Sequence, residues 1–376
     1  MNAVLPDGRI DADIVVLGEA PSNEEVLDGF PFVGPAGRLL FNEILPRAGI
    51  RRDDCYVLNV HWETPPGRKW ETIPAQHLGR YDHQVHDSIV AHPHKVIIAV
   101  GEHALDFLNQ KTAIRQSSTA ITKWRGSILH DHDWGCPIVP MIHPNAVLRA
   151  GGYEGDDDDE KTSRKANHYK ALCVHDATRA RKIVDNPQSM VNPTRNVLHI
   201  GNSTFEELCT ELLRYKSQPS PISFDIETFA HTTTCIGLGT SATHSIVIPL
   251  TQIDRISSRE RADLVKIVSD VLDGPNPKIG QHLDYDVQHL ARIGIPVRNV
   301  WLDTAVAHSI LHPEIPHDLG TLTSLYTLQP YFKDMREDSK EVDTIEYDDR
   351  LWDYNGLDCC VTWEIGMKLA EELENA

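Results

Sequence analysis

The chain has 376 residues, 40% of them apolar and 24% charged, which is the size and composition of two globular domains. No run of 18 apolar residues is present, and the N-terminus lacks the layout of a signal peptide, so we expect neither a membrane span nor export. The seven cysteines are scattered without a C-x-x-C pair, which argues against a disulfide scaffold and indicates a reducing, cytoplasmic compartment.

The formal net charge of −19 at pH 7 argues at first against a nucleic-acid partner, because phosphate binding usually needs a basic surface. Most of the excess negative charge lies after residue 190. Hard divalent cations take oxygen ligands, so a site that holds them must be rich in carboxylates. An acidic second half is therefore compatible with a metal-dependent enzyme.

The first half alternates short apolar runs with amphipathic stretches. This alternation predicts an α/β domain with a mainly parallel sheet. The predicted strands are residues 14–17, 57–60, 96–100 and 137–142, and the predicted helices are residues 38–48, 103–109 and 167–184.

A glycine-containing, highly charged stretch at 150–167 predicts an exposed loop, and a proline-containing, weakly apolar stretch before residue 197 predicts an interdomain linker. We place the domains at 1–187 and 197–376, with the linker at 188–196. The second half has predicted strands at 197–200 and 222–226 and a strand pair within 234–250, and predicted helices at 204–216, 259–272, 284–293, 304–311 and 351–374.

Four acids and a tyrosine are the candidate catalytic groups of the second half. Asp225 and Glu227 stand two apart at the end of an apolar strand, so both side chains face one side. Asp286 lies near the start of a helix, and Tyr354 and Asp358 share one helix face at a spacing of four. Such carboxylates can hold two metal ions for phosphodiester hydrolysis, and the phenol can orient or help deprotonate the attacking water.

The motifs FDIET, GQHLDYD and Y-x-x-x-D occur in this order. Over residues 196–376 they resemble the 3′→5′ exonuclease domain of the family-A DNA polymerases, in the DEDD group with a tyrosine. The resemblance implies a ribonuclease H-like fold and two Mg²⁺ (or Mn²⁺) ions held by Asp225, Glu227, Asp286 and Asp358, with Tyr354 positioning water. His282 stands where that family usually has asparagine. We expect Asp303 to be a structural cap or a supporting group and not a ligand.

In the first half, polar or aromatic residues follow the predicted strands, where open α/β sheets place ligands. The stretches GEAP, PFVG-x-AG-x-LL and HP-x-x-x-LR, with a strand-end asparagine, resemble the iron–sulfur (family four) uracil-DNA glycosylases over residues 10–185. The resemblance implies a three-layer α/β fold. It further implies that Phe32 stacks on a flipped uracil, Asn59 binds its polar edge, His143 stabilises the charge on the departing base, and Glu19 positions water or stabilises the sugar cation.

The first half departs from that family in its cysteines. It has no C-x-x-C before the first motif, and His61 and Trp62 stand near the position where the family has a cysteine after the strand-end asparagine. Because cluster ligation needs thiolates, we expect no iron–sulfur cluster. Ser22 replaces the usual glycine after GEAP. The histidines in this region lack strict metal-ligand spacing, so we interpret them as surface residues: His83, His86, His92 and His94.

Together these motifs predict an enzyme of DNA replication or repair, in a bacterial or phage-infected cell. It would trim 3′ ends by two-metal hydrolysis and recognise, and excise, uracil. The expected partners are single-stranded or frayed 3′ ends, uracil-containing DNA and a DNA polymerase. One alternative is an exonuclease subunit acting with a separate polymerase, whose first half only binds DNA or protein. A preference of the nuclease for RNA is another.

Overall fold

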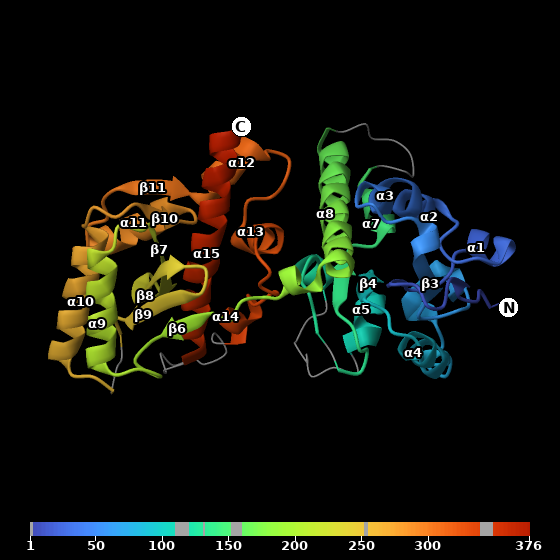
Figure 1. Cartoon of the computed structure of the whole chain (residues 1–376), viewed down its shortest axis with the longest axis horizontal. Helices are drawn as coiled ribbons and strands as arrows, with labels where there is room; N and C mark the ends of the chain where they lie inside the picture. The colour runs from blue at the N-terminus through green and yellow to red at the C-terminus, as the bar shows by residue number, and fades with distance from the viewer. Residues whose placement is uncertain (1–2, 110–119, 131, 152–159, 252–254, 339–348) are drawn as a thin grey trace. The chain divides into compact units, whose positions relative to one another are not determined.

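The computed structural model describes residues 3–109, 120–130, 132–151, 160–251, 255–338 and 349–376. The chain divides into two compact units, Met1–Val191 and Asn192–Ala376, coloured blue to green and green to red in Figure 1. The division falls inside the stretch predicted as the linker, 188–196. Among the described residues, no helix is both long and apolar enough to cross a membrane.

The first unit is built on a five-stranded sheet in the order β1-β3-β2-β4-β5, parallel except for β1. Its inner strands are continuous apolar runs whose residues are buried, as expected for strands covered on both faces. The strands are β1 (Asp7–Gly8), β2 (Ile14–Gly18), β3 (Cys55–Asn59), β4 (Val96–Val100) and β5 (Ile138–Met141).

Helices cover this sheet, with α8 packed on β4 and β5 and α5 packed on β2 and β4. The predicted helix 38–48 is present as three consecutive helical segments, the middle one a π-helix. The helix predicted from residue 167 already begins at residue 160. The helices are α1 (Asn23–Asp28), α2 (Pro35–Leu39), η1 (Leu40–Ile44), α3 (Leu45–Arg47), η2 (Arg52–Asp54), η3 (Pro66–Arg68), η4 (Trp70–Thr72), α4 (Asp82–Val90), α5 (Glu102–Asn109), α6 (Ile121–Trp124), α7 (Pro144–Ala150), α8 (Glu160–Asp185) and η5 (Pro187–Met190).

The second unit has a six-stranded sheet in the order β11-β10-β7-β8-β9-β6. Strands β7, β8 and β9 form an antiparallel meander, and β10 and β11 add in parallel on the other side of β7. This arrangement is the ribonuclease H-like topology that the sequence predicted. The strands are β6 (Asn196–Leu198), β7 (Ile222–Phe229), β8 (Thr232–Ser241), β9 (His244–Pro249), β10 (Lys278–Gly280) and β11 (Val300–Asp303).

Two helices of this unit begin with capping boxes, at Thr204 with Glu207 and at Ser257 with Glu260, which explains why each helix starts where it does. The long C-terminal helix α15 packs on β7, β8 and β9. The helices are α9 (Phe205–Ser217), α10 (Ser258–Leu272), α11 (Leu283–Arg292), α12 (Thr304–Leu311), α13 (Leu319–Tyr326), α14 (Asp334–Asp338) and α15 (Asp349–Asn375).

Glycines let α15 lie directly on the sheet. A Cβ atom added to Gly237 of β8 would lie 2.4 Å from Asn355 Oδ1 and 2.6 Å from Cys359 Sγ. On the neighbouring strand, the Ser223 hydroxyl donates a 2.7 Å hydrogen bond to the Cys359 carbonyl. This close approach brings the middle of α15 next to β7, the strand that carries Asp225.

The packing of α15 on the sheet can also be tested at a glycine of the helix itself. A Cβ on Gly356 would lie 2.2 Å from Val197 Cγ1 and 2.9 Å from Ser245 Oγ. We predict that Gly356→Ala lowers the thermal midpoint, because overpacking costs about 1–3 kcal/mol and outweighs the gain in helix propensity. Gly320→Ala, whose Cβ would meet only the Asp318 side chain, is the control for calorimetry. Equal midpoints for the two variants would contradict this packing.

Candidate active sites

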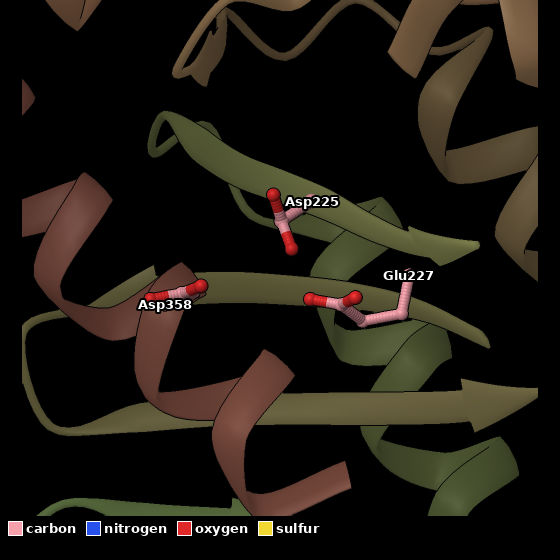
Figure 2. A group of neighbouring side chains, drawn as sticks. All are labelled: Asp225, Glu227 and Asp358. Carbon is pink, nitrogen blue, oxygen red and sulfur yellow. The ribbon is translucent and has the colours of Figure 1, made fainter. Parts of the chain in front are cut away.

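Three of the predicted acids meet on one side of the second sheet. Asp225 and Glu227 project from β7 and Asp358 from α15, and Figure 2 shows the three carboxylates turned toward one another. One ligand oxygen from each lies within 4.8 Å of the others. Strand β7 continues to Phe229, so the D-x-E pair lies within the strand and not at its end as predicted. Oxygen ligands at this spacing suit a hard divalent cation.

Asp286 adds a fourth carboxylate from the first turn of α11. It is buried, and its pKa is raised by that burial and then by the charges of Glu227, Asp303 and Asp358. Burial, followed by the charges of Asp286, Asp358 and Glu227, likewise raises the pKa of Asp225 well above its ordinary value. The four acids therefore act on one another electrostatically, although Asp286 lies outside the tight group of three.

Three further side chains, one amide and two cations, contact these acids, and the sequence motifs do not include them. Asn355 donates a 2.6 Å hydrogen bond from Nδ2 to Asp225 Oδ2. Lys333 Nζ lies 2.7 and 2.8 Å from the two oxygens of Asp358, and Arg336 Nη2 lies 3.1 Å from Glu227 Oε2. Asn355 directly follows the motif tyrosine, which could have marked it; the two cations lie between motifs, where no spacing marks them.

Tyr354 is buried beside Asp358. Its hydroxyl accepts a 2.8 Å hydrogen bond from Lys333, and burial, together with the Asp358 charge, raises the pKa of the phenol. The tyrosine therefore stays protonated, which favours a role in orienting a water molecule over a role as a base.

Of two other residues named from the sequence, Asp303 and His282, one holds the local backbone. Asp303 caps α12 through hydrogen bonds from the N–H groups of Ala305 and Val306, and it also accepts from Leu283 N at 2.8 Å. The prediction that Asp303 is a cap is confirmed. His282 precedes α11 with a positive φ of 55° and makes no side-chain cap.

The candidate residues of the first unit gather around two glycines at strand ends. A Cβ on Gly18, the last residue of β2, would lie 2.4 Å from Phe32 Cζ and 2.4 Å from Asn59 Oδ1. A Cβ on Gly101, just after β4, would lie 2.3 Å from Glu19 Oε1 and 3.1 Å from His143 Cδ2. Both points lie at the carboxyl-end edge of the parallel sheet, where such folds bind ligands.

Two of these side chains have hydrogen-bonding groups that a ligand could meet. Asn59 is 4% exposed, yet its Nδ2 has no hydrogen-bond partner in the described part of the chain. A buried donor without a partner is costly and points to a ligand acceptor. His143 accepts a 3.1 Å hydrogen bond at Nδ1 from Asn145 N, and burial lowers its pKa, so the ring is neutral at physiological pH.

The backbone holds Phe32 in an uncommon conformation with φ 56°. The carboxylate of Glu25 accepts hydrogen bonds from Phe32 N and, at 2.5 Å, from Ser22 N. Glu25 was not among the residues predicted for this site. A Cβ on Gly37 would overlap the Phe32 carbonyl. Glu25 and Gly37 therefore fix the direction of the buried aromatic ring.

The thiols of this unit do not fit an iron–sulfur cluster. All three of its cysteines are buried and unpaired: Cys55, Cys136 and Cys173. Three thiols are fewer than the four that such a cluster takes. We therefore derive no chemistry from such a cluster.

The first unit places an amide, an imidazole and an aromatic ring at one edge of its sheet, and the second unit holds a group of carboxylates. Comparison with known proteins gives a family for each unit. Residues 5–168 match the uracil DNA glycosylase superfamily, and residues 200–374 match the 3′-5′ exonuclease domain of the DNA polymerase A type. The chain belongs to the uracil-DNA glycosylase superfamily and carries a 3′-5′ exonuclease domain, and it is an enzyme of DNA repair or replication.

Several individual proteins share these domains. The type-4 uracil-DNA glycosylase of Thermotoga maritima is 32% identical over 185 residues, covering 49% of this chain and 83% of that protein. The type-4 uracil-DNA glycosylase of Archaeoglobus fulgidus is 35% identical over 143 residues, covering 38% of this chain and 69% of that protein. The DNA polymerase of Bacillus phage SP01 is 28% identical over 228 residues, covering 59% of this chain but 21% of that polymerase. The alternative of a first half that only binds is not favoured by these matches.

The role of Glu25 generates a stability prediction. We predict that Glu25→Ala destabilises the first unit by about 1–3 kcal/mol, because it leaves two backbone donors without their acceptor. Glu24→Ala is the matched control: it breaks an exposed 3.3 Å ion pair with Arg38, and exposed pairs contribute about 0–1 kcal/mol. Chemical denaturation of both variants makes the comparison, and equal losses would refute the anchoring role of Glu25.

Proposed function

We propose that the second unit removes nucleotides from the 3′ ends of DNA by metal-dependent hydrolysis. The exonuclease domain in this proposal spans residues 197–376. The observation that carries the proposal is the meeting of Asp225, Glu227 and Asp358 oxygens within 4.8 Å. Asp286, which acts on the same group electrostatically, completes a set of four carboxylates. The preferred substrates are single-stranded or frayed 3′ ends.

These residues fit two Mg²⁺ or Mn²⁺ ions, which would supply an activated water and stabilise the leaving oxygen of the phosphodiester. Asn355 holds the Asp225 carboxylate in place through its 2.6 Å hydrogen bond. Tyr354 keeps its proton and orients the attacking water from the side of α15. Because the carboxylates repel DNA phosphates, we expect DNA affinity to be weak and sensitive to salt unless divalent ions are bound.

We propose a second activity for the first unit, residues 1–187, namely recognition and excision of uracil in DNA. The specific observation is the buried Asn59 Nδ2, which suits an acceptor oxygen on a base edge. Phe32 would stack on the flipped base. The neutral His143 would donate a hydrogen bond to the charge that develops on the departing base, and Glu19 would orient water or stabilise the sugar cation.

The residues between these units, 188–196, serve as the linker in this proposal. A DNA polymerase is a further proposed partner, supported by the match to a phage DNA polymerase. The proposed location is the cytoplasm, where the DNA substrate and a reducing environment occur together.

The nuclease proposal is tested with a 5′-labelled single strand, in Mg²⁺ or in EDTA. We predict stepwise 3′ shortening that needs Mg²⁺ and falls by at least about 10³-fold in Asp225→Ala, since electrostatic stabilisation by the metal site supplies much of the rate. Asp263→Ala, which removes a carboxylate from helix α10 and not from strand β7, is the control and should leave the shortening unchanged. Shortening that persists in EDTA or in Asp225→Ala would exclude this site. A matched RNA strand tests the alternative substrate.

The glycosylase proposal is tested on a strand with a single internal uracil, in EDTA, followed by alkali. We predict breakage at the uracil, reduced about 10²-fold or more in Asn59→Ala, because the lost amide no longer holds the base. Asn42→Ala, which removes an exposed amide from the same unit, should cut like the unaltered protein. Equal breakage by the Asn59 and Asn42 variants would show that the pocket assignment is wrong.

A further inference from the structure

Two cationic side chains from one short segment, Lys333 and Arg336, contact the acids of the second unit's carboxylate site. Lys333 Nζ contacts both carboxylate oxygens of Asp358, at 2.7 and 2.8 Å, and the Tyr354 hydroxyl at 2.8 Å. Three residues further, Arg336 pairs with Glu227 at 3.1 Å. The two carboxylates that these cations contact, Asp358 and Glu227, belong to the group of three with metal-ligand spacing.

Burial of the two carboxylates strengthens the electrostatic attraction in these ion pairs. The side chains of Asp358 and Glu227 are 5% and 6% exposed, and those of Lys333 and Arg336 are 23% and 41% exposed. Each pair thus joins a buried acid to a cation that reaches in from the surface. Charge pairs in such low-dielectric surroundings are screened less than pairs in open water.

A metal ion and Lys333 need the same atoms. With Lys333 bonded to both oxygens of Asp358, the ammonium occupies the positions from which that carboxylate would bind a cation. Two positive charges cannot share these oxygens at hydrogen-bonding distance without strong repulsion. Binding of a divalent ion to Asp358 therefore requires Lys333 to leave.

We propose that Lys333 is a built-in counterion of the exonuclease site, which competes with divalent metal for Asp358 and lowers the site's metal affinity. The inference rests on the proposed function, because it takes the carboxylates to be metal ligands. The segment that holds Lys333 is anchored beside the site by Phe332, which is buried and packs against the Tyr354 ring at 5.8 Å. The ammonium can thus move without release of the segment.

The competition predicts a gain of metal binding on loss of the lysine. In titration calorimetry of the full chain with Mn²⁺, without DNA, we expect Lys333→Met to bind Mn²⁺ roughly tenfold more tightly than the unaltered protein. Lys333→Gln, which keeps a hydrogen-bond donor but not the charge, should behave similarly and serves if the methionine variant does not fold. Lys216→Met removes a lysine from an exposed 2.9 Å pair with Asp270 and should leave Mn²⁺ binding unchanged.

Two outcomes separate failure of this inference from failure of the proposed function. If the unaltered protein binds no Mn²⁺, or binds it as well after Asp225→Ala, the carboxylates are not a metal site and the proposed function falls. If Asp225→Ala abolishes binding but both Lys333 variants bind Mn²⁺ no more tightly than the unaltered protein, the metal site stands and the competition is overturned.

Discussion

The second unit depends on keeping four carboxylates together against their mutual repulsion. Burial first, and then the like charges of the neighbouring acids, disfavour ionisation and raise the pKa of Asp225 and of Asp286. The fold opposes the repulsion with rigid packing, since α15 lies on glycines of β8 and is tied to β7 through Ser223. An acidic chain can therefore hold a site for an anionic substrate, because the same charges that repel phosphate gather the cations that attract it.

The first unit sets a different requirement, because the base that we propose as its ligand is neutral. The groups proposed to face that base are an amide, a neutral imidazole and an aromatic ring, supplied by Asn59, His143 and Phe32. Burial favours the uncharged form of His143, so the ring is available as a hydrogen-bond donor or acceptor with no net charge. Two local costs accompany this arrangement: the positive φ of Phe32, and the buried Asn59 Nδ2, which has no hydrogen-bond partner among the residues that the structure describes.

Much of this arrangement could be predicted from the sequence, because it depends on local patterns. Continuous apolar runs marked the parallel strands, and the motif order placed Asp225, Asp286 and Asp358 in one site. The missed residues act through tertiary contacts. Lys333 and Asp358 are 25 positions apart, and no periodicity joins them. Glu25 supports Phe32 through backbone N–H groups, which a sequence does not display.

The two sites place different electrostatic demands on the residues around them. In the proposed first site, a neutral histidine stabilises the charge that develops on the departing base. Nearby metal ions or carboxylates would disturb this histidine, since each shifts the pKa of an imidazole over several ångströms. A metal site needs deprotonated acids, and burial works against them in the second unit, because it raises the pKa values of Asp225 and Asp286. The cations of Lys333 and Arg336 supply part of the opposing charge. Each unit has its own sheet, and each sheet presents a different set of charged and neutral groups at the site beside it.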